Sequence, residues 1–235
     1  MSILQLYSKD EFFTSVKPTE FKNGQFCWVP TPILDKIPRI LDIQRNLPEE
    51  HEEVRFELRL ANQSDDFKRR DRSLPIKYLN LRSNEELLAQ RAKKRPAIIL
   101  SSGVECFFDI EKLLKSKGKK HHQEDCLFVV PCYNILKETY GPGFIPEQVA
   151  LIQCLMYRQF FYIPDSAHFS ELIARFDRIH VVIDRSPTSI EPTDLCLAEE
   201  IFNLFLAMFL YCISGKTDKN LDTVKEIVSE ALPAS

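Results

Sequence analysis

The fold is decided by the stretch KKRPAIILS, residues 93–101, in which a basic turn leads directly into a short, fully apolar run. A run of this length, bounded by Pro and Ser, is typical of a strand buried on both faces. We expect this strand to hold Arg95 on a rigid support at the rim of the core. Two further segments accompany it, GQFCWVP at 24–30 and CLFVVPC at 126–132, and each contains an apolar strand that proline stops.

The composition indicates a globular protein without a strong overall field. The chain has 235 residues and is 44% hydrophobic, which allows a sizeable core in one domain, or in one domain and a half. A net charge of −3 gives no global basic field that would attract nucleic acid. Basic residues nevertheless cluster at 68–72, 91–95 and 112–122. Each cluster is either a local patch for a polyanion or an ordinary solvated surface.

Seven cysteines lie scattered through the sequence, and none forms a CxxC pair. Most of them lie in apolar runs, which favours free, buried thiols in a reducing compartment over a disulfide framework or a zinc site. The N-terminus has no basic region followed by an apolar stretch, so we expect no signal peptide. The longest apolar run, 201–213, is interrupted by Asn203 and is shorter than the roughly 18 residues that suggest a membrane span. We therefore expect a cytoplasmic protein that makes no contact with a membrane.

Strand signals dominate the first part of the chain, and helix signals the last part. Apolar runs or clean alternation predict strands at 25–29, 54–60, 97–100, 126–130 and 159–163. A helix is predicted from Ser83 to the residue before Pro96, and helices over 193–232 begin at a cap, Thr193 or Asp194. The proline-rich residues 31–50 are expected to be loop, with one short helix at most. Connections too irregular for βαβ repeats favour an α+β fold, with a small antiparallel barrel or curled sheet and helices on one side.

Four blocks, in the right order, resemble the MazF/PemK/Kid toxins. Residues 24–29 resemble the opening strand of that family, 95–101 its RPAVVLS-type second block, 127–132 its strand ending in Val-Pro, and 174–179 its later strand. The resemblance implies an SH3-like β-barrel with helices, usually a homodimer. It also implies cleavage of single-stranded RNA such as mRNA without a metal or other cofactor, and a protein antitoxin that blocks it. Residues 1–235 would then form a single domain of the PemK type, with an insertion at 31–94 between the first and second core strands.

The candidate catalytic residues come mainly from the fourth block. In the Kid branch of the family the later strand carries an Arg-x-Asp pair used for catalysis, which matches Arg175 and Asp177 here. Residues two apart on a strand point to the same face, and an Asp beside an Arg stays ionised and able to accept a proton. We expect Asp177 to take the 2′-hydroxyl proton and Arg175 to clamp the phosphate, with Arg95 as a second positive charge. The products would be a 2′,3′-cyclic phosphate and a 5′-hydroxyl.

The RNA-binding residues are expected beside Arg95 and after the third block. Lys93 and Lys94 precede Arg95 and bring positive charge. After Val-Pro-x the family often has Thr or Ser, whereas this chain has Tyr133 and Asn134, whose hydroxyl and amide groups can bind phosphate. An aromatic ring can also stack on a base of single-stranded RNA.

The same residues have plainer interpretations. Arg175 and Asp177 would also suit a structural salt bridge, with Arg178 as a further partner, and Arg95 would suit a surface turn. Two functions of different classes therefore stay open. One is a metal-independent endoribonuclease of a type II toxin–antitoxin system, and the other is a non-catalytic barrel of this type that binds RNA or a protein partner. Inhibition of a topoisomerase ranks last, because it rests on fold analogy alone.

Overall fold

The computed structural model divides the chain into two compact units. Unit 1 consists of Met1–Pro30 and Lys94–Ser235, and unit 2 of Thr31–Lys93. Unit 2 covers nearly the same residues as the insertion expected at 31–94. The residues that the structure describes are 2–33, 38–45, 54–62, 64–68, 81–82, 84–103, 107–119, 122, 125–136, 143–183 and 185–229.

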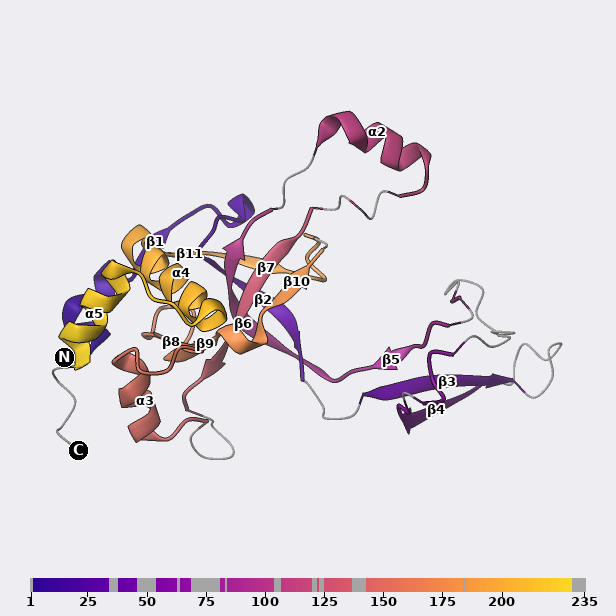
Figure 1. The fold of residues 1–235 in the computed structure, drawn as a ribbon, viewed down its shortest axis with the longest axis horizontal. Helices are drawn as coiled ribbons and strands as arrows, with labels where there is room; N and C mark the ends of the chain where they lie inside the picture. The colour runs from indigo at the N-terminus through magenta and orange to yellow at the C-terminus, as the bar shows by residue number, and fades with distance from the viewer. Residues whose placement is uncertain are drawn as a thin grey trace. The chain divides into compact units, whose positions relative to one another are not determined.

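Unit 1 is built on one sheet, to which eight of the described strands belong (Figure 1). In sheet order these are β1 (Phe13–Ser15), β11 (Glu191–Leu197), β2 (Gln25–Pro32), β6 (Ala92–Ser101), β7 (Leu127–Asn134), β9 (Leu172–Arg175) and β8 (Phe160–Ile163), while β10 (His180–Val182) also pairs with β7. The pairs whose register is defined are all antiparallel. Among the described strands no pairing joins β1 to β8, so the sheet is an open path.

The central strand β6 is buried on both faces, as its sequence predicts. Ile98 belongs to the main hydrophobic core, whereas its neighbours Ala97 and Ile99 belong to a second cluster on the opposite face. Successive side chains of a strand point to opposite faces, so a continuously apolar run is the pattern that such a strand requires. The predictions of strands at 97–100, 126–130 and 159–163 are therefore confirmed, although β6 begins five residues earlier and β7 continues four residues beyond its predicted end.

The longest helices come at the end of the chain. α4 (Glu199–Ser214) and α5 (Lys219–Ser229) follow β11. The shorter helices are α1 (Ile3–Leu6), α2 (Phe108–Ser116), α3 (Pro146–Gln153), and the 3₁₀ turns η1 (Lys9–Glu11) and η2 (Pro18–Glu20). With its antiparallel sheet and C-terminal helices, the chain is an α+β protein, as predicted.

The predicted start of the C-terminal helices was wrong. Residues 193–197 belong to β11, and the Thr193 hydroxyl donates a hydrogen bond to the Phe26 carbonyl, 2.8 Å away, instead of capping a helix. Polar residues that suit a helix cap also suit an irregular strand, and here the pairing of β11 with β2 decides between them. Gly215 ends α4 in the left-handed conformation, with φ of 70°. Residues 230–232 of the predicted range lie outside the described part.

The helix expected from Ser83 was also wrong. Of the described residues 84–91, only the short strand β5 (Leu88–Ala89) has regular structure, and β6 then begins at Ala92. The Glu85 side chain accepts a hydrogen bond from the Arg82 amide and closes a turn, whereas the predicted cap, Ser83, lies outside the described residues. Just before β6, the Arg91 carbonyl accepts a hydrogen bond from the amide of Ile33, the residue after β2, at 2.7 Å.

α4 covers the main core with one face. Its buried residues are Ile201, Leu204, Phe205 and Met208. The Phe205 ring lies 5.3 Å from the Phe161 ring of β8 and 4.9 Å from the Phe176 ring, measured between centroids. Although its sequence is apolar nearly all round, Leu210 and Ile213, which lie away from this face, are exposed. α4 is therefore buried mainly on one side. Through the contact between Phe205 and Phe176, it packs directly against the segment that follows β9.

Unit 2 contains a small antiparallel sheet of its own. Its described strands are β4 (Val54–Leu60), β3 (Arg39–Arg45) and β5, in that order. The strand predicted at 54–60 is confirmed, but the loop predicted at 31–50 was wrong for residues 39–45, which pair along their whole length with β4. The alternating apolar and charged residues of β4 needed a partner strand, and β3 supplies it despite the nearby prolines.

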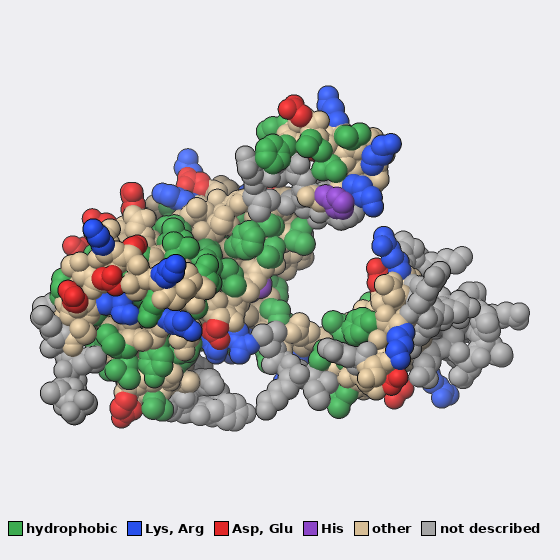
Figure 2. Space-filling view, viewed as in Figure 1, with side chains coloured by type: hydrophobic (Ala, Val, Ile, Leu, Met, Phe, Trp, Pro, Cys, Tyr) green, Lys and Arg blue, Asp and Glu red, His purple; other side chains and the backbone are tan. Residues whose placement is uncertain are grey.

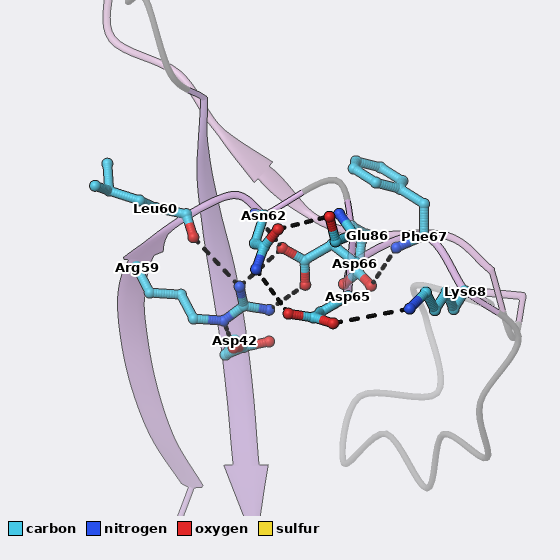
Figure 3. A network of polar contacts seen from close by, with 10 residues as sticks. Asp42, Arg59, Leu60, Asn62, Asp65, Asp66, Phe67, Lys68 and Glu86 are labelled. Carbon is cyan, nitrogen blue, oxygen red and sulfur yellow. Dashed lines mark hydrogen bonds and ion pairs between the residues drawn. The ribbon is translucent and has the colours of Figure 1, made fainter.

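A polar network ties β4 to the turn that follows it (Figure 3). The Arg59 guanidinium donates to both oxygens of the buried Asp66 carboxylate, at 2.9 Å and 2.5 Å, and also pairs with Asp42 on β3. These hydrogen bonds raise the pKa of Arg59 above its usual value. The Asp66 carboxylate also accepts from the Asn62 amide at 2.7 Å. A buried carboxylate is retained only with such partners, so we interpret the network as the structural centre of unit 2.

The expectations about the cysteines and about membrane-spanning helices can be compared with the structure. The six cysteines among the described residues, Cys27, Cys126, Cys132, Cys154, Cys196 and Cys212, are all free, and four of them are buried. Burial raises the pKa of the Cys27 thiol to about 12 and that of Cys196 to about 11. Within the described part of the chain, no helix combines the length and the apolar character that crossing a membrane would require.

Candidate functional site

The candidate site is organised around Pro131, in the middle of β7. Proline has no amide proton and cannot complete a hydrogen-bonded ladder with a neighbouring strand. The neighbouring segment is broken at this point: β9 pairs with residues 132–134 and β10 with residues 127–129. Between them the chain forms a single 3₁₀ turn, η5 (Phe176–Arg178). The sequence predicted that β7 would stop at Pro131, whereas β7 continues and its neighbour is interrupted.

Arg175 lies immediately before this interruption, and Asp177 lies within it. Arg175 is the last residue of β9 and Asp177 is the middle residue of η5, so the prediction that both lie on one strand was wrong. The turn nevertheless brings them together. Arg175 donates from Nε to Asp177 Oδ1 at 3.0 Å and from Nη2 to Oδ2 at 2.5 Å. These hydrogen bonds raise the pKa of the half-buried Arg175 above its usual value, although burial opposes the rise.

A second guanidinium reaches the same place from β6. Ala97 faces Pro131 in the register of β6 with β7, so Arg95, two residues before Ala97, lies beside Tyr133. The guanidinium carbon of Arg95 lies 4.3 Å from the centroid of the Tyr133 ring, and that of Arg175 lies 5.3 Å from it. Both distances are within the range of cation–π contacts, so one ring supports two cations.

The remaining predicted site residues are not all part of this cluster. Lys94 forms an ion pair with Glu191 of β11. Lys93 is exposed and is the last residue of unit 2. Asn134 is exposed at the end of β7, opposite Leu172, and its side chain makes no hydrogen bond with any described residue. Of the predicted residues, the structure therefore brings together Arg95, Tyr133, Arg175 and Asp177.

Two residues of the cluster were not predicted as site residues. The guanidinium carbon of Arg175 lies 5.5 Å from the centroid of the Phe160 ring, which faces it in the β8–β9 register. Nε of Arg178 lies 3.4 Å from Oδ2 of Asp177. Arg178 was considered only as an alternative salt-bridge partner. Phe160 lay in a predicted strand, but nothing in the sequence gives the register that places it under Arg175.

The cluster formed by Arg95, Tyr133, Phe160, Arg175, Asp177 and Arg178 is suited to bind an anion. The cluster contains three guanidinium groups and one carboxylate, and this composition gives it a net positive charge. Guanidinium groups bind phosphate through two parallel hydrogen bonds, and aromatic rings hold them in place. Arg95 lies over the Tyr133 ring, so the ring contacts a cation in this structure. A base could stack on the ring only if the Arg95 guanidinium moved.

His180, at the start of β10, is a half-buried residue close to the site in sequence. Its two ring nitrogens are inaccessible to solvent and have no hydrogen-bond partner among the described residues. His180 pairs with Val129, whose side chain belongs to the second hydrophobic cluster. This burial lowers the pKa of His180, because the charged imidazolium would lose its hydration. His180 is therefore harder to protonate than a solvent-exposed histidine.

We expect His180 to make the stability of the protein pH-dependent. Its folded-state pKa lies below the unfolded value, so the unfolded chain binds a proton more readily as pH falls below about 6.5. The free energy of unfolding should therefore decrease as pH falls from 7 towards 5. A His180→Phe variant should lose part of this slope in urea denaturation series at several pH values. Replacement of the exposed His168, which pairs with Asp194, is the control, and an unchanged slope in His180→Phe would refute the expectation.

Comparisons with family models, with curated proteins and with solved structures found no match for this chain. Within the described part of the chain, no three His, Cys, Asp or Glu side chains gather in a way that could hold a metal ion.

Proposed function

We propose that the protein is a metal-independent endoribonuclease toxin that cleaves single-stranded RNA to 2′,3′-cyclic phosphate and 5′-hydroxyl ends. The proposal includes an SH3-like barrel fold of the MazF/PemK type, a cognate antitoxin and a homodimer. The observation that carries it is Arg95. This half-buried arginine has no carboxylate partner among the described residues, and it lies on the same tyrosine as Arg175. An unneutralised guanidinium beside a paired one is an arrangement that favours a phosphate diester.

Each group in the cluster fits one step of this reaction. Asp177 would accept the proton of the 2′-hydroxyl as that oxygen attacks the neighbouring phosphorus. Negative charge then grows on the phosphate oxygens, and Arg175 and Arg95 would stabilise it with hydrogen bonds already in position. The 5′-oxygen leaves and takes a proton from water, because a guanidinium group hardly ever gives one up.

The role of Arg95 can be tested by a single substitution. Arg95→Gln removes one phosphate contact, so we expect RNA affinity to fall about tenfold or more, and the slope of log K against log salt to decrease by about 0.7. Fluorescence anisotropy with a long single-stranded RNA in EDTA measures both, and gel analysis of product ends measures cleavage. The matched control is Arg185→Gln, because Arg185 is an exposed arginine paired with Asp125. Equal behaviour of the two variants, or no cleavage by the unmodified protein, would contradict the proposal.

Tyr133 should act through its ring and not through its hydroxyl. Tyr133→Phe keeps the surface on which Arg95 and Arg175 lie, so we expect RNA affinity within a factor of about three of the unmodified protein. Tyr133→Leu removes the cation–π contacts and should weaken binding by about 3-fold to 30-fold. The same anisotropy assay compares the two. A loss in Tyr133→Phe as large as that in Tyr133→Leu would instead assign the hydroxyl a direct role at the phosphate.

A second candidate function is binding of RNA without cleavage. It is favoured by the position of Asp177, whose two oxygens both accept from Arg175 while Arg178 lies nearby. A carboxylate engaged in this way must lose a hydrogen bond before it can accept a substrate proton. Tight binding of RNA in EDTA with no cleaved product after long incubation would select this function over the first.

A further inference from the structure

The strand β4 of unit 2 has an open outer edge (Figure 1). It comes first in the sheet order β4–β3–β5, so no strand that the structure describes pairs with its outer side. Every second residue of such a strand directs its backbone N–H and C=O groups away from the sheet. β4 is seven residues long and contains no proline or glycine, so its backbone is suited to pair with a further strand.

One side of β4 is apolar and exposed. Phe56 is 60% exposed, Leu58 is 56% exposed and Leu60 is 58% exposed. Figure 2 shows hydrophobic side chains at the surface of unit 2. Edge strands of monomeric proteins are usually protected by prolines, bulges or short length, and a long apolar edge strand is typical of one that pairs with another chain.

The other side of β4 carries charges of alternating sign. Arg55, Glu57 and Arg59 are each two residues apart, so their side chains point to the same side of the strand. Arg59 is engaged within unit 2, where it pairs with Asp66 and Asp42. Arg55 is exposed and forms no ion pair with any residue that the structure describes. The strand therefore offers an unpaired cation two residues away from an exposed carboxylate.

These charges make β4 complementary to itself in one antiparallel register. With a two-fold axis at Phe56, Arg55 of each copy stands opposite Glu57 of the other copy, which gives two pairs of opposite charge. An axis at Glu57 would set two carboxylates against each other, and an axis at Leu58 would use Arg59, which its own unit already binds. Parallel pairing in register would place like charges side by side. The charge pattern therefore selects a second copy as the partner, and Phe56 as the centre.

We propose that β4 of one copy pairs with β4 of a second copy, antiparallel and about a two-fold axis at Phe56. The small sheets of the two copies then join into one continuous sheet, and backbone hydrogen bonds along the shared edge supply much of the affinity. The two Phe56 side chains meet at the centre of the apolar side, and the two pairs of Arg55 and Glu57 lie on the other side. Such a contact uses the same surface on both copies, so association stops at the dimer.

This inference gives the proposed homodimer a contact surface in unit 2. It does not depend on the proposed RNA chemistry, because no residue of β4 belongs to the cluster around Arg175. The paired segment is short, so we expect a weak dimer whose population rises with protein concentration.

Reversal of either charge should weaken the dimer. Arg55→Glu sets carboxylates against each other in both pairs, and Glu57→Arg does the same with guanidinium groups. Each change should raise the dimer dissociation constant about tenfold or more, because it replaces two attractive pairs by two repulsive ones. Sedimentation velocity over a concentration series, at low salt and without RNA, measures this constant. The matched control is Arg39→Glu, an equal charge reversal at an exposed residue of the inner strand β3, and it should leave the dimer intact.

Mixing the two weakened variants tests the register itself. In a mixed pair, both carboxylates of the Arg55→Glu copy stand opposite guanidinium groups of the Glu57→Arg copy, so both pairs become attractive again. The mixture should therefore associate about tenfold or more tightly than either variant alone. Circular dichroism of each variant establishes that it is folded. The proposal would be overturned by an unmodified protein that stays monomeric at all concentrations, by a dimer that neither reversal weakens, or by a mixture no tighter than its components.

Discussion

Replacing Asp177 by asparagine should reduce the rate of RNA cleavage about 10²-fold to 10⁴-fold, the usual contribution of a positioned general base. Asparagine keeps the size of the side chain, and its amide oxygen can still accept a hydrogen bond from Arg175, so the turn η5 should stay in place. RNA affinity should be equal or higher, because the change removes a negative charge from a cluster that binds phosphate. Single-turnover cleavage of a labelled RNA in EDTA, with affinity measured separately, isolates the chemical step.

Asp125→Asn is the matched control for this substitution. Asp125 is also paired with an arginine, Arg185, at 2.6 Å, but it lies outside the cluster and should not affect cleavage. An Asp177→Asn variant with an unchanged rate would remove the base role. A parallel loss of affinity and rate would mean that Asp177 acts only by holding Arg175. The structural salt bridge would then be the correct interpretation of this pair.

Replacing Phe205 by alanine should lower the free energy of unfolding of unit 1 by about 3–5 kcal/mol. Phe205 is fully buried, and its ring contacts those of Phe161, Phe176 and Phe202. The cavity would open between α4 and the segment 175–178. Because Phe176 belongs to η5, the substitution should also loosen the position of Asp177. A destabilised core would thus reduce RNA cleavage at temperatures where the protein is still folded.

Urea denaturation monitored through Trp28 measures this change. Trp28 is the only tryptophan in the chain and lies in the part of β2 that belongs to unit 1, so its fluorescence reports on that unit. Ile213→Ala, on the same helix but 65% exposed, is the control and should cost less than about 1 kcal/mol. A loss of stability in Phe205→Ala as small as that of the control would show that α4 does not depend on this face for its attachment.

The sequence was informative where burial follows directly from a continuous apolar run. β6 and β7 could be predicted because a strand buried on both faces needs such a run and little else produces it in so few residues. β11 and β3 were misassigned because polar and proline-rich segments suit several local structures, and only a partner strand decides among them. The partner lies far away in the sequence, so a local pattern contains no information about it.

The candidate site, too, could be predicted from the sequence only in part. Arg175 and Asp177 were paired from their spacing, and the ion pair forms, although through a turn and not along a strand. Pro131 does not end its own strand, β7. It interrupts the neighbouring segment, between β9 and β10. Phe160 could not be predicted because the β8–β9 register places it. The contacts of Arg95 and Arg175 with Tyr133 could be predicted only if the β6–β7 register and the β7–β9 register were both known.

The connection between β2 and β6 has a consequence for folding. The two strands are neighbours in the sheet, and their pairing extends to the hydrogen bond between Ile33 and Arg91. The chain between Ile33 and Arg91 is therefore one connection, and its two ends must meet before the centre of the sheet is complete. Relative to a four-residue hairpin turn, this is about four doublings in length, which adds only about 2.4 kcal/mol of closure entropy. A long insertion at this point therefore costs little free energy. Any structure that forms early in unit 2 shortens the flexible length that must be closed.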